Sequence, residues 1–524
     1  MSNNTTCSVP HTDYITYNIE VALFDPIADN LASGAGLVSS PTQLAAASHV
    51  VAGVAADSAT QVLVQVPGVN SGDPIQLTLS DENGISSDGV GAGYLTALPA
   101  DGMDSRTSAG VIIVTAVAAG SGAYAFADYH APSDFVRAGN NTDPTVKVRS
   151  VTIGVTDSTT GTTTTQTVSI VRPPVILVHG LWGTPSDFSG ADGGVLGALE
   201  SSGLFTVSFG RYDNSGMGIS SSNPTYNVPG VTPLGASGNA LGFQFGAQTV
   251  LPQIVGFINA YKTVALILAA GPGSGPIAAV QADIVAHSMG GNVTRMLPQL
   301  AEYAIQNTFN IGYVHKLITI DTPHQGAKLA AALLNPSNSC VESMLAVGGN
   351  YSFSSVVTSD GRYINGAMGD LQPGSNALVA THTGNNVIPT AMIGAQMTTA
   401  QLNGAGTTGS GRVVRIICST LSNPLAIELT PLYWPDVAGS ATDPSDAVVP
   451  LSSQFDGEQA TYPVANPAVA VYGIHSKGPE QLGFLPPTVL DQASCAGQTS
   501  CAPTEVINLL NTPVSTTTVF EAKP

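Results

Sequence analysis

The strongest chemical signal in this 524-residue chain is a serine in a short turn between an apolar run and a helix-like segment. The turn reads IVAHSMGGN over residues 284–292. Small residues two positions before and after Ser288, Ala286 and Gly290, permit a tight bend that projects the Ser288 hydroxyl above a sheet. A hydroxyl in that position can act as a nucleophile. We interpret His287 as a packed residue that supports the turn, with its side chain directed away from the Ser288 hydroxyl.

A second apolar run, VILV, opens into the loop HGLWG over residues 179–183. Acyl transfer needs backbone N–H groups aimed where a carbonyl oxygen becomes negative, and a glycine-containing bend after a strand can present one of them. We therefore assign the N–H groups of Leu181 and Met289 as an oxyanion hole, with His179 and Gly180 as supporting residues. Alone, this loop would be an ordinary strand-ending turn, but its occurrence together with the Ser288 turn favours the catalytic interpretation.

The elements that must position these groups follow the pair Pro173-Pro174. Short apolar runs (VILV, ADIVA, KLITI) alternate with longer helix-like segments, which indicates a mostly parallel sheet covered on both faces. Two stretches near residues 215–242 and 340–435 are rich in Gly, Ser, Asn and Thr, and we expect them to be cap or lid insertions. The predicted class of residues 173–524 is therefore α/β.

Residues 1–172 have a different pattern, with short β-branched or alternating runs separated by Gly, Asp, Asn and Pro. This pattern is typical of an antiparallel β-sandwich of the immunoglobulin or fibronectin kind. Two runs on either side of the turn TDSTTG predict a hairpin that ends the sandwich. The predicted domains are thus an all-β accessory domain, 1–172, and a second domain, 173–524.

Composition excludes several classes of partner. The formal charge of −20, from 15 Lys and Arg against 35 Asp and Glu, argues against nucleic acid. No apolar run reaches the ~18 residues of a membrane helix. The N-terminus lacks a leader pattern, and the composition favours a secreted or cell-surface form recorded after processing. The five cysteines form no metal-binding pattern; Cys495 and Cys501 are either a disulfide or two free thiols.

Taken together, these segments resemble bacterial lipases and esterases of the α/β-hydrolase fold. The HGLWG loop, the AHSMGG turn, DTPHQG at 321–326 and DAVVPL at 446–451 occur in that family's order. The resemblance covers residues 174–524 only. Ala286 stands where the family more commonly has Gly, as in some secreted lipases. Asp321 also stands where Gly is more common, and we interpret it as structural.

The resemblance implies a catalytic triad in the chain order serine, acid, histidine. His475 follows an apolar run near the C-terminus and fits the position of the base. Asp446 matches the family's acid segment, although Asp443 and Asp436 lie close enough in sequence to compete.

Other polar residues are expected to have supporting roles. His315 opens a strand, and His324 lies in a turn that packs near the site in the resembling family. His382 is expected at the surface. Arg295 is expected to form a structural ion pair or a helix cap, with a contact to an anionic substrate as the alternative.

The resemblance further implies a two-step serine esterase that needs no cofactor and no metal. Its substrate would be an ester or lipid, at an interface or polymer surface in some cases, and the protein would be a monomer. The apolar stretch 416–432 is either an acyl-facing lid or the core of an insertion.

Three alternatives stay open. A polyester depolymerase and an acyltransferase would use the same triad, whereas a surface or adhesion protein would use none of it. The accessory domain is either a binding module, whose deletion leaves the chemistry intact, or a folding support, whose deletion gives insoluble protein.

Overall fold

The computed structural model describes the chain from residue 19 to residue 520, with gaps. The described ranges are 19–85, 91–98, 110–181, 183–190, 192–212, 242–264, 275–333, 356–357, 363–364, 366–383, 388–396, 439–440, 443–446, 448–456, 469–475, 488–495, 500–514 and 518–520.

Two β-sheets occupy most of the described part of residues 19–171. One has five strands: β1 (Ala22–Phe24), β5 (Gln61–Pro67), β11 (Gly122–His130) and β10 (Val117–Ala119), with β8 (Tyr94–Ala97) also paired to β11. The other has seven: β16 (Ile277–Ala278), β4 (Gly53–Ala55), β13 (Thr163–Val171), β12 (Val148–Asp157), β6 (Pro74–Asp81) and β7 (Gly84–Ile85), with β9 (Val111–Thr115) also paired to β6. Most pairings are antiparallel, but β4 runs parallel to β13.

The two sheets share one hydrophobic core. Alternate residues of β5, such as Val62 and Val64, and of β6, such as Leu77 and Leu79, are buried in the same cluster. Strands β12 and β13 pair antiparallel, which is the hairpin that the sequence predicts around TDSTTG. Along β6 every second residue is buried, which follows from the two-residue period of a strand with one face on a core, whereas β5 is buried on both faces and its Leu63 packs in a separate cluster.

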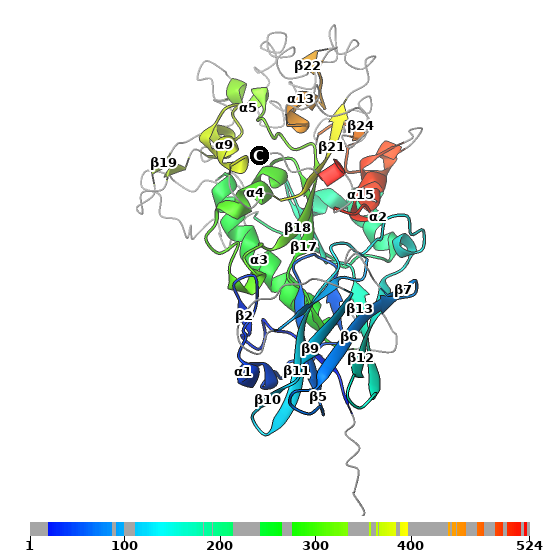
Figure 1. Cartoon of the computed structure of the whole chain (residues 1–524). Helices are drawn as coiled ribbons and strands as arrows, with labels where there is room; N and C mark the ends of the chain where they lie inside the picture. Colours follow the sequence, from blue (N-terminus) through cyan, green and yellow to red (C-terminus); the bar gives the residue numbers. More distant parts are fainter. Residues whose placement is uncertain are drawn as a thin grey trace, which may run out of the picture.

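A six-stranded parallel sheet forms the centre of the remaining chain (Figure 1). Its strands, in spatial order, are β15 (Val207–Gly210), β14 (Val175–Val178), β17 (Ala282–His287), β18 (Val314–Ile320), β21 (Thr390–Gln396) and β24 (Val469–Tyr472). This order fits the expected α/β-hydrolase-like fold. The chain moves outward from β14 to β15 and then to β17 on the other side, so the loops after β14 and β17 flank a topological switch point.

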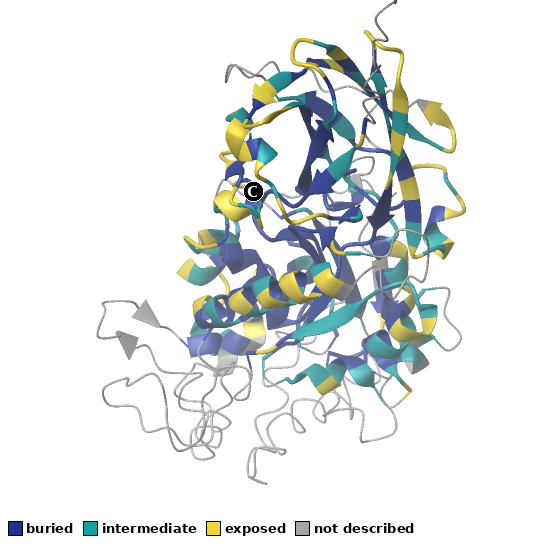
Figure 2. Cartoon of the chain, turned by 90° about the horizontal axis from the view of Figure 1, so that it is seen from below, coloured by how far each residue is buried: buried dark blue, intermediate teal, exposed yellow. Residues whose placement is uncertain are grey.

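Helices cover both faces of this sheet, as Figure 1 shows. Ile176 and Val178 pack with α3 and α4 in one cluster, whereas Val175 and Leu177 pack with α2 and α15 in another. The inner strands β14, β17 and β18 are consequently buried on both faces, and buried residues are dark blue in Figure 2. The covering helices are α2 (Gly194–Ser202), α3 (Phe243–Val264), α4 (Met289–Met296) and α15 (Ala502–Leu510).

Two features differ from the sequence prediction. Strand β21 lies inside the stretch 340–435 that composition assigns to an insertion, together with α8 (Gly366–Asp370) and α9 (Asn376–Thr381). Its single apolar run is short and is surrounded by loop-like sequence, so composition hides it. The helix-like sequence after Ser288 runs over residues 292–306 (NVTRMLPQLAEYAIQ), but the helix ends at Met296, because Pro298 cannot donate to the helix and restricts the residue before it.

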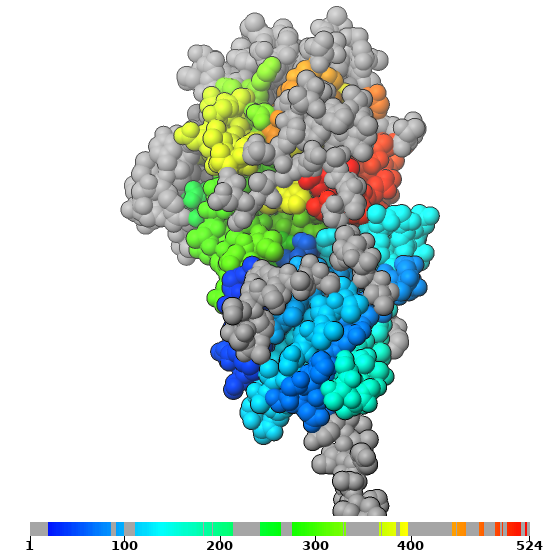
Figure 3. Space-filling view, viewed as in Figure 1, coloured from blue at the N-terminus to red at the C-terminus, as the bar shows by residue number. Residues whose placement is uncertain are grey.

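The N-terminal sheets and the parallel sheet are joined by backbone pairing. β16, which belongs to the later part of the chain, pairs parallel with β4. The buried carboxylate of Asp57 accepts hydrogen bonds from the N–H groups of Val280 and Gln281, both at 2.9 Å. In Figure 3 the blue and cyan residues of the N-terminal sheets lie directly against the green residues. These contacts lie at the amino end of β17, since β16 and residues 280–281 directly precede that strand.

Shorter elements complete the described structure. Cys495 and Cys501 form a disulfide beside α15. No helix in the described ranges is both long and apolar enough to cross a membrane. The remaining helices and strands are α1 (Pro41–Ala45), α5 (Lys328–Leu333), α13 (Leu451–Gln454), β2 (Ala32–Ser33), β3 (Gly36–Leu37), β19 (Val356–Val357), β20 (Tyr363–Ile364), β22 (Gly439–Ser440) and β23 (Asp443–Pro444), with short 3-10 turns between them.

Candidate active site

Ser288 lies in a strained turn between β17 and α4. Its backbone has φ 55° and ψ −132°, a combination that L-residues rarely adopt. Two neighbours hold this conformation: the Ser288 N–H donates to Ile320 O at 2.8 Å, and the Thr322 hydroxyl donates to Ser288 O at 2.9 Å. The loop after β18 therefore supports the turn that presents the serine.

Ser288, His475 and Asp446 form a hydrogen-bonded chain. The Ser288 Oγ lies 2.8 Å from His475 Nε2, and His475 Nδ1 lies 2.7 Å from Asp446 Oδ2. All three residues are buried. A carboxylate accepts from Nδ1, so the Nδ1 proton stays there and Nε2 is left to accept from the serine hydroxyl. This arrangement has the geometry of an activated serine nucleophile.

The acid position is well defined by backbone donors. Asp446 Oδ1 accepts from the N–H groups of Val448 at 2.8 Å and Val449 at 2.7 Å, while its backbone oxygen accepts from His475 N–H at 3.1 Å. The competing Asp443 instead accepts from the backbone and hydroxyl of Ser452. Asp436, the other competitor, lies outside the described residues.

The loop after β14 lies against the serine. A Cβ added to Gly180 would lie 2.6 Å from Ser288 Cβ, so only glycine allows this approach. Gly290 is equally constrained, because a Cβ there would meet the backbone oxygens of Val178 and His179. Within the described part of the chain, the N–H groups of Leu181 and Met289 have no hydrogen-bond acceptor. Met289 follows Ser288 in the chain, and Leu181 follows Gly180, which lies against the serine, so both N–H groups are candidates to bind a ligand oxygen.

His179 and Tyr212 fix the start of this loop. Their rings stack with centroids 4.5 Å apart and an interplanar angle of 2°. The Tyr212 hydroxyl donates to His179 O at 2.6 Å, and burial raises the pKa of Tyr212 well above its usual value, so the phenol stays neutral. His179 therefore has a structural role at the start of the loop, where Tyr212 holds its ring and its backbone oxygen.

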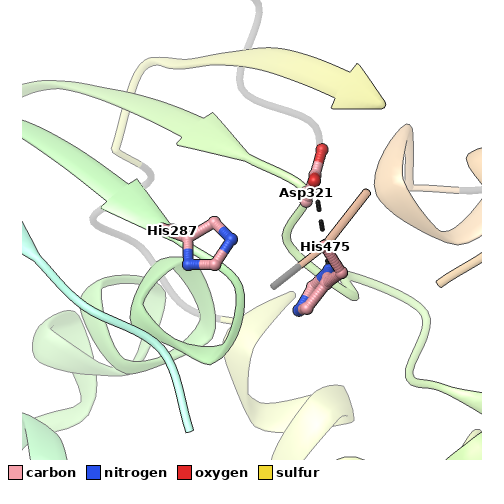
Figure 4. Close-up of side chains that lie close together, drawn as sticks. All are labelled: His287, Asp321 and His475. Atoms are coloured by element: carbon pink, nitrogen blue, oxygen red, sulfur yellow. Dashed lines mark ion pairs between the residues drawn. The ribbon is translucent and has the colours of Figure 1, made fainter. Parts of the chain in front are cut away.

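His287 and Asp321 lie close to His475 (Figure 4). The His287 ring centroid is 5.1 Å from that of His475. Burial, and then the charge of His475, lower the pKa of His287 well below its usual value, so the ring is neutral. Asp321 Oδ2 lies 4.0 Å from His475 Nδ1. The sequence interpretation of Asp321 did not place it beside the base; its departure from the family's Gly, at the end of a buried strand, is the signal that points to it.

His287, Asp321 and His475 could also be considered as metal ligands, since their donor atoms lie within 4.8 Å of one another. A structural or catalytic zinc site uses three or four protein ligands. Because His475 Nδ1 already donates to Asp446, ligation through that atom would break the bond that orients the ring. The arrangement thus fits the base of a serine triad better than a metal centre.

A second buried polar cluster lies near the site and contains Arg295. Its guanidinium lies 2.9 Å from Asp456 Oδ2, which is the ion pair expected from sequence. Asp456 also contacts His382 Nε2 at 2.6 Å. The prediction that His382 is a surface residue is therefore wrong: its ring is largely covered, because Asp456 and the Leu378 oxygen hold its two nitrogens.

The charges of this cluster are set by their neighbours. Burial opposes the charge of Asp456, but the hydrogen bond from His382 and the nearby positive charges outweigh it and hold the pKa of Asp456 below its usual value. Burial and the adjacent Arg295 lower the pKa of His324, whose Nε2 lies 3.1 Å from the Thr319 hydroxyl. The cluster links α4, α9 and the segment after α13.

The remaining predicted features lie elsewhere. His315 is at the amino end of β18, opposite the Ser288 end of the sheet. The predicted lid, 416–432, lies outside the described residues, as does most of the predicted insertion 215–242.

Comparison with known proteins gives structural neighbours alone. No family model and no curated protein matches the chain. Among solved structures, the chain is similar to Bacillus licheniformis lipase BlEst2 in mature form, with 12% identity over 60% of this chain and 89% of that chain and a TM-score of 0.29. It is similar to EstA from Clostridium botulinum, with 14% identity over 65% and 88% of the two chains and a TM-score of 0.31. Staphylococcus hyicus lipase shows 11% identity over 64% and 93%, with a TM-score of 0.30. These neighbours are bacterial lipases and esterases, but likenesses at such TM-scores add no weight to a functional assignment.

Proposed function

We propose that this protein is a serine carboxylic-ester hydrolase that acts on apolar acyl esters. The observation that carries the proposal is the continuous chain of hydrogen bonds from Ser288 Oγ through His475 to Asp446, with distances of 2.8 and 2.7 Å. The strained backbone of Ser288, at φ 55°, supports it, because strain of this kind is retained where the surrounding structure holds a residue for a task.

The first step is acylation of the serine. Ser288 Oγ attacks the ester carbonyl carbon while His475 Nε2 takes the hydroxyl proton. Asp446 stabilises the resulting imidazolium through Nδ1 and keeps the ring in the correct tautomer. The same proton is then donated to the oxygen of the leaving alcohol, and the acyl group remains on Ser288.

The developing negative charge on the carbonyl oxygen needs donors that are already in place. The N–H groups of Leu181 and Met289 serve as this oxyanion hole, because they follow Gly180 and Ser288, which lie against each other, and have no acceptor among the described residues. Water then attacks the acyl-enzyme with His475 as its base, which releases the carboxylic acid and restores the serine. Protein groups perform each of these steps.

The organisation of the chain follows from the same proposal. Residues 173–524 form the catalytic domain, and residues 1–172 form an accessory domain that supports its folding, since Asp57 and β4 bind β16 and the following backbone. Deletion of 1–172 is therefore expected to give insoluble protein, and a soluble, active fragment would contradict the support role. The disulfide between Cys495 and Cys501 supports a secreted or cell-surface location.

The experiment compares the full chain with Ser288→Ala on p-nitrophenyl esters from acetate to palmitate. Substitution of the nucleophile is expected to lower kcat by at least about 10⁴-fold without loss of folded protein. The preferred acyl length then defines the substrate class, and partition of product to an added alcohol separates hydrolysis from acyl transfer. Equal turnover by the two proteins, or none by either, would contradict the proposal.

A further inference from the structure

Asp321 is a buried carboxyl group beside His475, and its surroundings do not stabilise a negative charge on it. It follows β18, has φ 52°, and its side chain is fully buried. Its backbone N–H donates to Ile393 O at 2.9 Å, which fixes the residue in this loop. Among the described residues, no N–H or hydroxyl group is in hydrogen-bond geometry with either carboxyl oxygen: the Ala395 N–H, which acts to lower the pKa of Asp321, donates to Gln454 Oε1 at 2.7 Å. A buried carboxylate without donors is expensive, so the neutral form is favoured.

Asp446, next to it, is built in the opposite way. It receives the N–H groups of Val448 and Val449 on one oxygen and His475 Nδ1 on the other. Three donors satisfy an ionised carboxylate, and none of its bonds requires a proton on Asp446. The two carboxyl groups are neighbours, since Asp446 Oδ2 and Asp321 Oδ2 lie 2.7 and 4.0 Å from the same atom, His475 Nδ1. Burial, followed by the charge of Asp446, raises the pKa of Asp321 well above its usual value. Two acids in contact cannot both ionise at low cost.

We propose that Asp321 is a neutral carboxylic acid that donates its O–H to Asp446, and thereby holds the carboxylate that orients His475. The inference rests on the proposed function and deepens it. Asp321 is a positioning residue, since it acts on His475 through Asp446. Its proton stays in place through the cycle: the proton that leaves Ser288 goes to His475 Nε2 and returns from there. The pair Asp321–Asp446 thus carries one negative charge, not two.

The pH profile of kcat/KM tests whether Asp321 is charged. Asp321→Asn removes no charge if Asp321 is neutral, so the acid limb of kcat/KM on p-nitrophenyl butyrate should stay within about 0.3 pH unit of the original chain. If Asp321 is ionised 4.0 Å from His475 Nδ1, its neutralisation would move that limb to lower pH by about one unit or more. Such a shift would overturn the inference.

The donor role is tested by comparing two substitutions. Asp321→Leu leaves Asp446 without the O–H donor and should lower kcat about tenfold to a hundredfold, with KM nearly unchanged. Asp321→Asn supplies an N–H donor of similar shape and should recover at least about tenfold of that loss. Equal kcat values for the two variants would overturn the donor role.

Two controls separate this result from misfolding and from failure of the proposed function. Titration of the serine with a fluorophosphonate gives the concentration of intact sites, so kcat is expressed per titrated site. Asp370→Asn makes the same substitution at another buried carboxyl, whose pKa burial raises to about 7 and which accepts the Phe243 N–H at the start of α3. It should leave the acid limb and kcat unchanged. Full turnover in Ser288→Ala would instead reject the proposed function itself, whatever Asp321 does.

Discussion

The parallel sheet carries a histidine–aspartate pair at each end of its strands, and the two pairs have nearly the same geometry. At the amino end, His315 Nδ1 lies 2.7 Å from Asp283 Oδ1, and Nε2 lies 2.8 Å from the Ser133 backbone oxygen. At the carboxyl end, His475 Nδ1 lies 2.7 Å from Asp446 Oδ2, and Nε2 lies 2.8 Å from Ser288 Oγ. The two pairs differ in the third partner.

That partner decides the charge of each ring. A backbone carbonyl only accepts, so His315 must donate from both nitrogens and is an imidazolium. A serine hydroxyl can donate, so His475 can remain neutral and accept a proton. Burial disfavours charge on His315, but the charge and hydrogen bond of Asp283 outweigh burial and raise the pKa of His315. His315 and Asp283 are thus an ion pair that clamps the structure, whereas His475 and Asp446 have the arrangement that the proposed base requires.

The difference matches the tasks of the two ends of the sheet. The clamp binds β17 and β18 to Ser133, which belongs to the N-terminal region. Nearby, Arg172 donates to the Asp143 backbone oxygen and to Asn511. Ligands of open α/β sheets bind at the carboxyl ends of the strands. We therefore expect substitutions at the amino end to change stability and those at the carboxyl end to change activity.

The largest expected effect is at the carboxyl end. His475→Asn removes the proposed base and should lower kcat per folded protein by at least about 10⁴-fold. The melting temperature should change by only about 2 °C, since His475 is not part of the His315–Asp283 ion pair. Steady-state kinetics and calorimetry on the same preparation measure both quantities. A large loss of stability with little loss of kcat would reverse the comparison.

The next effect is at the amino end. Asp283→Ala leaves the His315 imidazolium buried without its counter-charge and should lower the free energy of unfolding by about 3–5 kcal/mol. Urea unfolding followed by circular dichroism measures this loss, while kcat per titrated site stays near that of the original chain. His49→Ala is the matched control, because His49 pairs with Asp29 but its side chain is 61% exposed. Its cost should be below about 1 kcal/mol. Equal losses in the free energy of unfolding for the two variants would show that the buried ion pair stabilises the protein no more than the exposed one.

The smallest effect is a pH dependence of stability. Because the pKa of His315 is raised in the folded protein, its contribution is complete below the unfolded value of about 6.5 and is lost as the pH rises through the folded pKa. The groups that face the ring are Asp283, Asp134 and Lys316. The melting temperature should therefore fall with rising pH in this window, and His315→Gln should flatten the slope. An unchanged slope in that variant would assign the dependence to other groups.

Local sequence was sufficient for some of these features and not for others. The tight turn at Ser288 and the bend at Gly180 are coded by small residues within a few positions, so both could be predicted with the strands that precede them. His475 was predicted from chain order and its place after an apolar run, and Asp446 from a segment that resembles the family's acid motif; the structure brings both to Ser288. The proximity of Asp321 to His475, and of His382 to Asp456, depends on how separate loops meet above the sheet. No local pattern encodes those contacts, or the clamp between His315 and Ser133.

The most direct test of the proposed mechanism is to trap the acyl-enzyme. The full chain is mixed with a p-nitrophenyl ester, quenched in acid within the first turnovers, digested and analysed by mass spectrometry. The account predicts that the peptide containing Ser288 gains the mass of the acyl group, and that Ser288→Ala shows neither the adduct nor the p-nitrophenol burst. An acyl group on another residue, or hydrolysis that continues in Ser288→Ala, would contradict it.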